Sequence, residues 1–180
     1  DLMIEDFEGY NGKVTDYTWE YAGTRNLLMP FYYHNDMELA SEPENDPDGY
    51  KFIDVEGQGN CFPKVTYQLR KSFTLVGKPK DPNHPIGKRV INLDAQTMTM
   101  ASLVTYDRKG DMWKWFPIGK AHSDHHLPIN EGKGVALEDY AFVIDVQANH
   151  CPTLQFTSQL TDNVNHPKPF SCQNMRKGGP

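Results

Sequence analysis

Apolar and polar residues alternate most clearly over residues 89–116, where three runs of β-branched, aromatic and long apolar side chains are separated by two groups of turn residues. The second turn ends in Gly110, which suits the positive φ of a bulged hairpin turn. The pattern predicts a β-meander with antiparallel strands at 89–93, 99–106 and 112–116. These runs hold more apolar side chains than a sheet with one wet face requires, so protein core or a bound ligand is expected to cover them.

Further strands are expected on both sides of the meander, and patterns of helical period are almost absent. Near the N-terminus, Gly23 interrupts the alternating pattern, so residues 13–21 and 26–33 are expected to form a hairpin. The expected strands are 13–21, 26–33, 65–76, 135–146 and 153–159, and the expected long loops are 38–59 and 117–134. The sequence therefore predicts a mostly β fold with long loops.

The length of 180 residues suits one domain with a sizeable core. We expect a single β domain over 1–160 and an extended tail over 161–180. Because Phe170, Cys172 and Met175 lie among prolines in that tail, we expect it to lie along another chain. The chain opens without Met and without the basic and apolar regions of a signal peptide, which favours a processed or truncated chain.

Acidic residues outnumber basic ones by 24 to 18, giving a net charge of −6. This charge argues against a nucleic-acid partner or an anionic membrane surface. Four basic residues do gather at positions 78, 80, 88 and 89, and we interpret them as a solvated face. No run approaches the roughly 18 apolar residues that a membrane helix needs, so no transmembrane segment is expected.

One cluster of residues has metal-ligand chemistry. His122, Asp124, His125 and His126 lie within five positions, and imidazole with carboxylate can bind zinc, copper or nickel. A site formed by His122, Asp124 and His126 is one hypothesis, and a flexible solvated loop is the other, because adjacent histidines often lack fixed supporting groups.

Catalytic motifs are absent from the sequence: there is no G-x-S-x-G elbow, H-E-x-x-H, P-loop or Rossmann glycine pattern. We therefore expect a protein that is not an enzyme and has no cofactor.

The aromatic residues and methionines allow two interpretations. They could fill a core, or a sheet could present them to an acyl chain or another apolar ligand, because Met side chains adapt to ligands of variable shape. Trp113 and Trp115 are spaced to share one face of a strand, with Lys114 pointing away. The residues expected to contact a hydrophobic ligand are Trp113, Trp115, Met98, Met100, Tyr106 and Trp19.

Three motifs resemble the Gram-negative domain-of-unknown-function family thirteen twenty-nine, which is similar to outer-membrane lipoprotein-sorting proteins. They are EDFEGYNGKV at 5–14, GKPKDPNHP at 77–85 followed by KRV at 88–90, and YDRKGDMWK at 106–114. The resemblance covers residues 1 to about 156, which correspond to the C-terminal part of longer family members. It implies a curved, unclosed half-barrel of the lipoprotein-carrier type, lined by apolar side chains, and no catalytic residues.

The resemblance also implies a periplasmic or outer-membrane location, in which at least one disulfide should form. The expected bond joins Cys151 to Cys172, or Cys61 to one of them. A partial barrel would leave an edge strand unpaired, so contacts with other chains are expected. The leading hypothesis is binding or transfer of a lipid or other hydrophobic molecule. A structural subunit that pairs through edge strands and tail is the second hypothesis, and metal binding is the third.

Overall fold

The computed structural model describes residues 3–6, 10–32, 53–155 and 157–161. Cys172 and nearly all of the expected tail, together with most of the expected loop 38–59, lie outside these residues. The described part is mostly β, as the sequence predicted. It also contains five short 3₁₀ helices, η1 (Ile4–Asp6), η2 (Val14–Asp16), η4 (Gln58–Asn60), η5 (Ser123–His125) and η6 (Pro128–Asn130).

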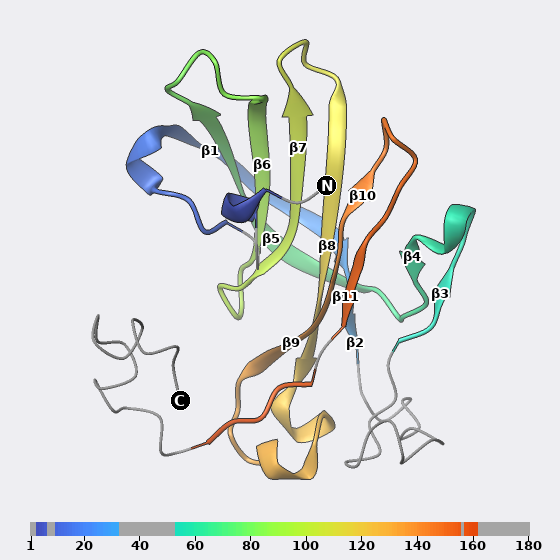
Figure 1. The fold of residues 1–180 in the computed structure, drawn as a ribbon. Helices are drawn as coiled ribbons and strands as arrows, with labels where there is room; N and C mark the ends of the chain where they lie inside the picture. The colour runs from blue at the N-terminus through green and yellow to red at the C-terminus, as the bar shows by residue number, and fades with distance from the viewer. Residues whose placement is uncertain (1–2, 7–9, 33–52, 156, 162–180) are drawn as a thin grey trace, which may run out of the picture.

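One large sheet contains nine strands, which pair in the order β1-β5-β6-β7-β8-β9-β11, with β2 and β10 also on β8. Their bounds are β1 Tyr17–Met29, β2 Phe31–Tyr32, β5 Gln68–Pro79, β6 Ile86–Asp94, β7 Met100–Asp107, β8 Met112–His122, β9 Ala136–Phe142, β10 Ile144–Asp145 and β11 Thr153–Gln155. Along the main path every pair is antiparallel, and only β2 runs parallel to β8. The sheet is strongly twisted and is not closed into a barrel (Figure 1).

The predicted meander is confirmed as β6, β7 and β8, but β8 is longer than expected. It continues through Pro117 to His122, where the sequence predicted irregular structure. Pro117 has no N–H to donate, and it lies where β8 exchanges one neighbour for another: Trp115 pairs with β10 and Ile118 pairs with β9. The proline is therefore tolerated in a long central strand.

The N-terminal hairpin expected around Gly23 is wrong. Residues 17–29 form one strand, β1, which pairs with β5 along its whole length. The register shifts between Tyr21 and Gly23, so the glycine, with φ of 103°, belongs to a β-bulge rather than a turn. After Pro30 the chain continues as β2 and pairs with the far end of β8.

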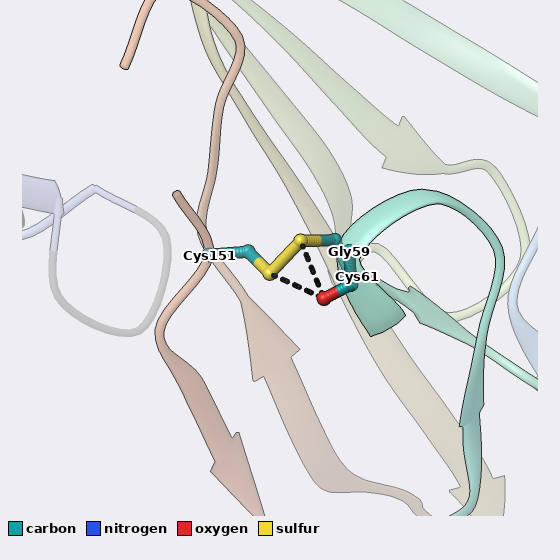
Figure 2. The surroundings of a disulfide bond; sticks show 3 residues. All are labelled: Gly59, Cys61 and Cys151. Atoms are coloured by element: carbon teal, nitrogen blue, oxygen red, sulfur yellow. Dashed lines mark hydrogen bonds between the residues drawn. A yellow bond between two sulfur atoms is a disulfide. The ribbon is translucent and has the colours of Figure 1, made fainter. Parts of the chain in front are cut away.

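A small hairpin covers the β9 side of the sheet. Strands β3 (Val55–Glu56) and β4 (Phe62–Pro63) pair with each other, and η4 lies between them. A disulfide joins Cys61 beside this hairpin to Cys151 just before β11, with the Gly59 carbonyl oxygen 3.5 Å from Cys61 Sγ (Figure 2). The expected Cys151–Cys172 bond is wrong in this structure because Cys151 is already bonded to Cys61, which was the other pairing considered.

Candidate ligand-binding surface

A row of apolar side chains crosses the middle of the sheet. Leu75, Ile91, Leu103 and Phe116 lie opposite one another on β5, β6, β7 and β8, so they share one face. The last three are almost completely buried. Val143 completes this core cluster, and its border consists of Tyr10, Trp19, Leu75, Leu93 and Met100. We call the four paired residues Leu75, Ile91, Leu103 and Phe116 the apolar row.

A second row lies two residues further along the same strands and on the same face. Gly77, Arg89, Thr105 and Lys114 are opposite one another in the register. Arg89 and Thr105 have 0% exposure and Lys114 has 5%. We call this set the cationic row. The interpretation of Arg89 as part of a solvated face is therefore wrong: its position in β6 fixes it on the covered face of the sheet.

Carboxylates of the N-terminal segment meet the cationic row. Asp6 Oδ1 lies 2.8 Å from Arg89 Nη1, and Glu5 forms a second ion pair with the same guanidinium. Glu5 also lies 2.8 Å from His84 Nε2, in the connection between β5 and β6. Ion pairs thus tie Glu5 and Asp6 to the sheet, and Figure 1 shows η1 lying over the strands.

The contact between the carboxylates and the cationic row leaves buried polar groups incompletely stabilised. Burial raises the pKa of Asp6 to about 6, although the Arg89 guanidinium opposes the shift; the Glu5 carboxylate adds to it. Thr105 Oγ1 and Arg89 Nε are buried, and neither has a hydrogen-bond partner among the described residues. Such groups normally find partners, so their presence marks a site that the protein's own side chains fill incompletely.

The six expected ligand-contacting residues do not line one surface. Trp19 and Met100 border the apolar row. Trp115 and Tyr106 belong to the opposite face, since Trp115 adjoins Phe116 in sequence and pairs with Val104, two positions before Tyr106.

The other expected residues have individual environments. Trp113 donates from Nε1 to Asp145 Oδ2 at 3.0 Å. Met98 is 59% exposed in the turn between β6 and β7. The ring of Tyr106 is covered by Lys88 Nζ at 3.9 Å from its centroid.

Trp115 packs against protein. Its ring lies 6.2 Å from that of Phe62, and it borders a buried cluster that contains Cys61 and Tyr140. For Trp115 the structure therefore supports the core interpretation, with the β3–β4 hairpin and its disulfide as the cover.

The histidine cluster is divided between the surface and the interior. His126 points inward, with Nε2 2.9 Å from Asp139 Oδ1 and Nδ1 2.9 Å from Asn130 Nδ2. His122 and Asp124 lie 3.7 Å apart and are about half exposed. The three expected ligands are thus not brought together, and no group of three His, Cys, Asp or Glu side chains is placed to hold a metal in the part of the chain described.

A pocket of about 830 Å³ adjoins the exposed part of this cluster. It contains two cations that are already paired, since Arg70 bonds Asp94 at 2.7 Å and Lys120 bonds Glu138 at 2.6 Å. Polar and apolar groups both line it: Phe31, Gln68, Arg70, Gln96, Thr97, Thr99, Lys120, Ala121, His122, Asp124, His125, Gly134, Val135 and Ala136.

The cationic row was missed at the sequence level, although a signal for it was available. Arg89 opens an expected strand in which only Asn92 is also polar, and Lys114 stands between two tryptophans. A charge inside an apolar strand needs a buried partner. The partners Glu5 and Asp6, however, are more than 80 positions away from Arg89, so only the fold connects them.

Comparisons with known proteins agree with this architecture. The chain is 26% identical over 125 residues to the uncharacterized protein PA3922 of Pseudomonas aeruginosa, a match that covers 68% of the chain and 25% of that protein. The chain thus spans about a quarter of the length of that curated relative.

Two solved structures share the fold. One is a Vibrio parahaemolyticus domain described as an outer membrane lipoprotein-sorting protein domain, with a TM-score of 0.53, 15% identity, and coverage of 99% of this chain and 53% of that one. The other is a DUF1329 family protein from Desulfovibrio piger, with a TM-score of 0.53, 13% identity, and coverage of 96% and 52%.

The Vibrio parahaemolyticus domain is described by lipoprotein sorting, and the Desulfovibrio piger protein is described only by its family. Among the described residues, no helix is both long enough and apolar enough to span a bilayer. The model of the family described as "Protein of unknown function (DUF1329)" matches residues 1–176. As its sequence motifs suggested, the chain belongs to the DUF1329 family.

Proposed function

We propose that this protein binds or transfers a lipid or another hydrophobic molecule, without catalysing a reaction, in the periplasm or at the outer membrane. The observation that carries the proposal is the apolar row, which runs across four strands and is bordered by large side chains that are only partly buried, including Trp19, Leu93 and Met100. An unclosed sheet can expose such a row when the chain segments packed over the row move aside.

Two further observations support the proposed location in the periplasm or at the outer membrane. The fold is shared with a domain described as lipoprotein-sorting. The disulfide between Cys61 and Cys151 suits an oxidising compartment such as the periplasm.

The test uses a neutral single-chain lipid, monododecanoylglycerol, titrated into the protein while tryptophan fluorescence is recorded. We expect saturable binding, because Trp19 borders the row. Met100→Gln should weaken binding several-fold, whereas Met98→Gln, the same change in the exposed turn, should leave it unchanged. Lipid extraction from protein purified from the cell envelope should yield a bound hydrophobic molecule. If no lipid is extracted and the neutral lipid does not bind, the proposal fails.

A second candidate, a structural subunit of a multi-chain assembly, is favoured by strand β1. In the described part of the chain β1 pairs with β5 alone, which leaves one edge of a 13-residue strand open. Leu28 and Leu69 face each other across these two strands and are 68% and 72% exposed. An open edge beside exposed leucines suits pairing with another strand.

A further inference from the structure

The cationic row contains two buried positive charges next to an apolar surface. Arg89 and Lys114 flank Thr105 across three adjacent strands, and all three side chains are almost fully buried. Removing a cation from water costs several kcal/mol unless an anion accompanies it. A surface that served only an apolar molecule would have no use for these charges.

One carboxylate of this site is fixed in place. Asp145 lies 4.0 Å from Lys114 Nζ, and its Oδ1 accepts hydrogen bonds from the backbone N–H groups of Gln147 and Ala148, while its Oδ2 accepts one from Trp113. Asp145 is therefore part of the sheet's own structure.

The other carboxylates come from a short segment. Glu5 and Asp6 belong to a single 3₁₀ turn, and both form ion pairs with Arg89. Glu5 also accepts a hydrogen bond from the Tyr17 hydroxyl and lies 2.8 Å from His84 Nε2. Counting described residues alone, the site without them contains Arg89, Lys114 and Asp145, with a net charge of +1. With both ionised the net charge is −1; burial raises the pKa of Asp6, and the neighbouring Glu5 carboxylate adds to this shift.

The fit between segment and site is also incomplete. Thr105 Oγ1 and Arg89 Nε are buried, and no hydrogen-bond partner for either is found among the described residues. A phosphate or carboxylate group carries several acceptor oxygens, which could satisfy both donors together with the remaining N–H groups of the guanidinium.

We propose that Arg89, Thr105 and Lys114 form a binding site for the oxyanion of an amphipathic ligand, and that the Glu5 and Asp6 carboxylates occupy it in the ligand's absence. The ligand class is a single-chain or larger lipid with a phosphate or carboxylate head group, whose chain lies along the apolar row. This inference rests on the proposed function and narrows it. A ligand must displace the segment, so the apparent affinity is reduced by the fraction of molecules in which the segment is bound.

The experiment compares three probes by isothermal titration calorimetry: dodecyl phosphate, inorganic phosphate and neutral monododecanoylglycerol. The full chain is used as wild type and as the double variant Glu5→Gln/Asp6→Asn. The double variant Asp54→Asn/Glu56→Gln is a matched control, because it removes the same two charges from exposed positions. We expect Glu5→Gln/Asp6→Asn to bind dodecyl phosphate about tenfold more tightly, a difference of about 1.4 kcal/mol, with no change for the neutral lipid or in the control.

Adding Thr105→Val to Glu5→Gln/Asp6→Asn tests the site itself. Valine has the same shape and suits a strand, so the protein should stay folded, while dodecyl phosphate should bind several-fold more weakly. If inorganic phosphate bound Glu5→Gln/Asp6→Asn as tightly as dodecyl phosphate does, the site would be assigned to a free anion. If dodecyl phosphate bound much more tightly than inorganic phosphate, the site would be assigned to a lipid head group.

Two results would overturn the inference. Unchanged dodecyl phosphate affinity in Glu5→Gln/Asp6→Asn would show that the carboxylates do not compete for the site. Equal tightening of the neutral lipid would show that the segment is only a steric cover, and the proposed function would survive. The proposed function itself would fail if neither the neutral lipid nor dodecyl phosphate bound any variant and no lipid were extracted from the purified protein, so the two failures are distinguishable.

Discussion

Arg89 and Asp6 show how one residue pair connects stability to pH. Arg89 is completely buried in β6, and Asp6 is 2% exposed beside it. Burial raises the pKa of Asp6 to about 6 from 3.8, against the opposing effect of Arg89. The folded state therefore holds a proton on Asp6 more tightly than the unfolded state does between pH 4 and 6. Stability from this group is present at low pH and is lost as pH rises through that window.

We predict that Asp6→Asn removes this pH dependence. Relative to the variant, the wild type should lose about 2–3 kcal/mol of unfolding free energy between pH 4 and 7, because a gap of one between the folded and unfolded pKa values corresponds to roughly 1.4 kcal/mol. Urea unfolding of both proteins at several pH values measures the difference. Asp54→Asn, at an exposed position, should show no such trend. A wild-type-minus-variant difference that is constant with pH would contradict the prediction.

At the scale of the elements, β8 and β9 approach each other closely because of one glycine. Gly119 pairs with Tyr140, and a Cβ atom at Gly119 would lie 2.0 Å from the tyrosine ring. Tyr140 has 0% exposure and belongs to the cluster under the β3–β4 hairpin. The ring therefore has no room to move away.

We predict that Gly119→Ala destabilises the fold by about 2–3 kcal/mol, as expected for overpacking in a core. Chemical denaturation measures this cost. In a Tyr140→Leu background the same glycine change should cost much less, because the clashing ring is gone. Equal costs in the two backgrounds would mean that the ring is not the reason for the glycine.

The disulfide fixes the β3–β4 hairpin against β11. It joins residues 90 positions apart, so it restricts the unfolded chain strongly. We predict that Cys61→Ser/Cys151→Ser lowers the unfolding free energy by roughly 3–5 kcal/mol. A peptide map without reduction should contain a Cys61–Cys151 peptide. Recovery of both cysteines as free thiols from protein made in an oxidising compartment would refute the assignment.

At the scale of the whole molecule, the open edge of β1 decides whether the chain associates. The chain covers about half of each solved structure it resembles, 53% and 52%. We predict that it self-associates or binds a partner through the edge of β1, and that Leu28→Lys/Leu69→Lys reduces this association because charges discourage edge pairing. Sedimentation measures the effect, with Arg108→Ala in the exposed β7–β8 turn as control. A wild type that sediments only as a folded monomer of 20.6 kDa would defeat the structural-subunit candidate.

The sequence by itself determined the mostly β class and the positions of the meander strands, because alternation and turn residues are local properties. Its motifs also identified the family. Local sequence signals were misleading where a strand distant in sequence pairs with the residue and changes its structural role. Gly23 reads as a turn but forms a bulge because β5 pairs on both sides of it, and Pro117 reads as a strand end but lies between two partners of β8.

The tertiary structure alone decided the candidate site. Alternation predicted that Lys114 points away from Trp113 and Trp115, but the register shifts at Trp113, and Lys114 Nζ lies 4.7 Å from the centroid of the Trp113 ring. Alternation also could not tell which face of the sheet is covered or by what. The pairing of Arg89 with Glu5 and Asp6, and of Cys61 with Cys151, joins residues 80 or more positions apart. Such contacts depend on the register of several strands at once, and register is fixed by the summed packing of the sheet rather than by any one stretch of sequence.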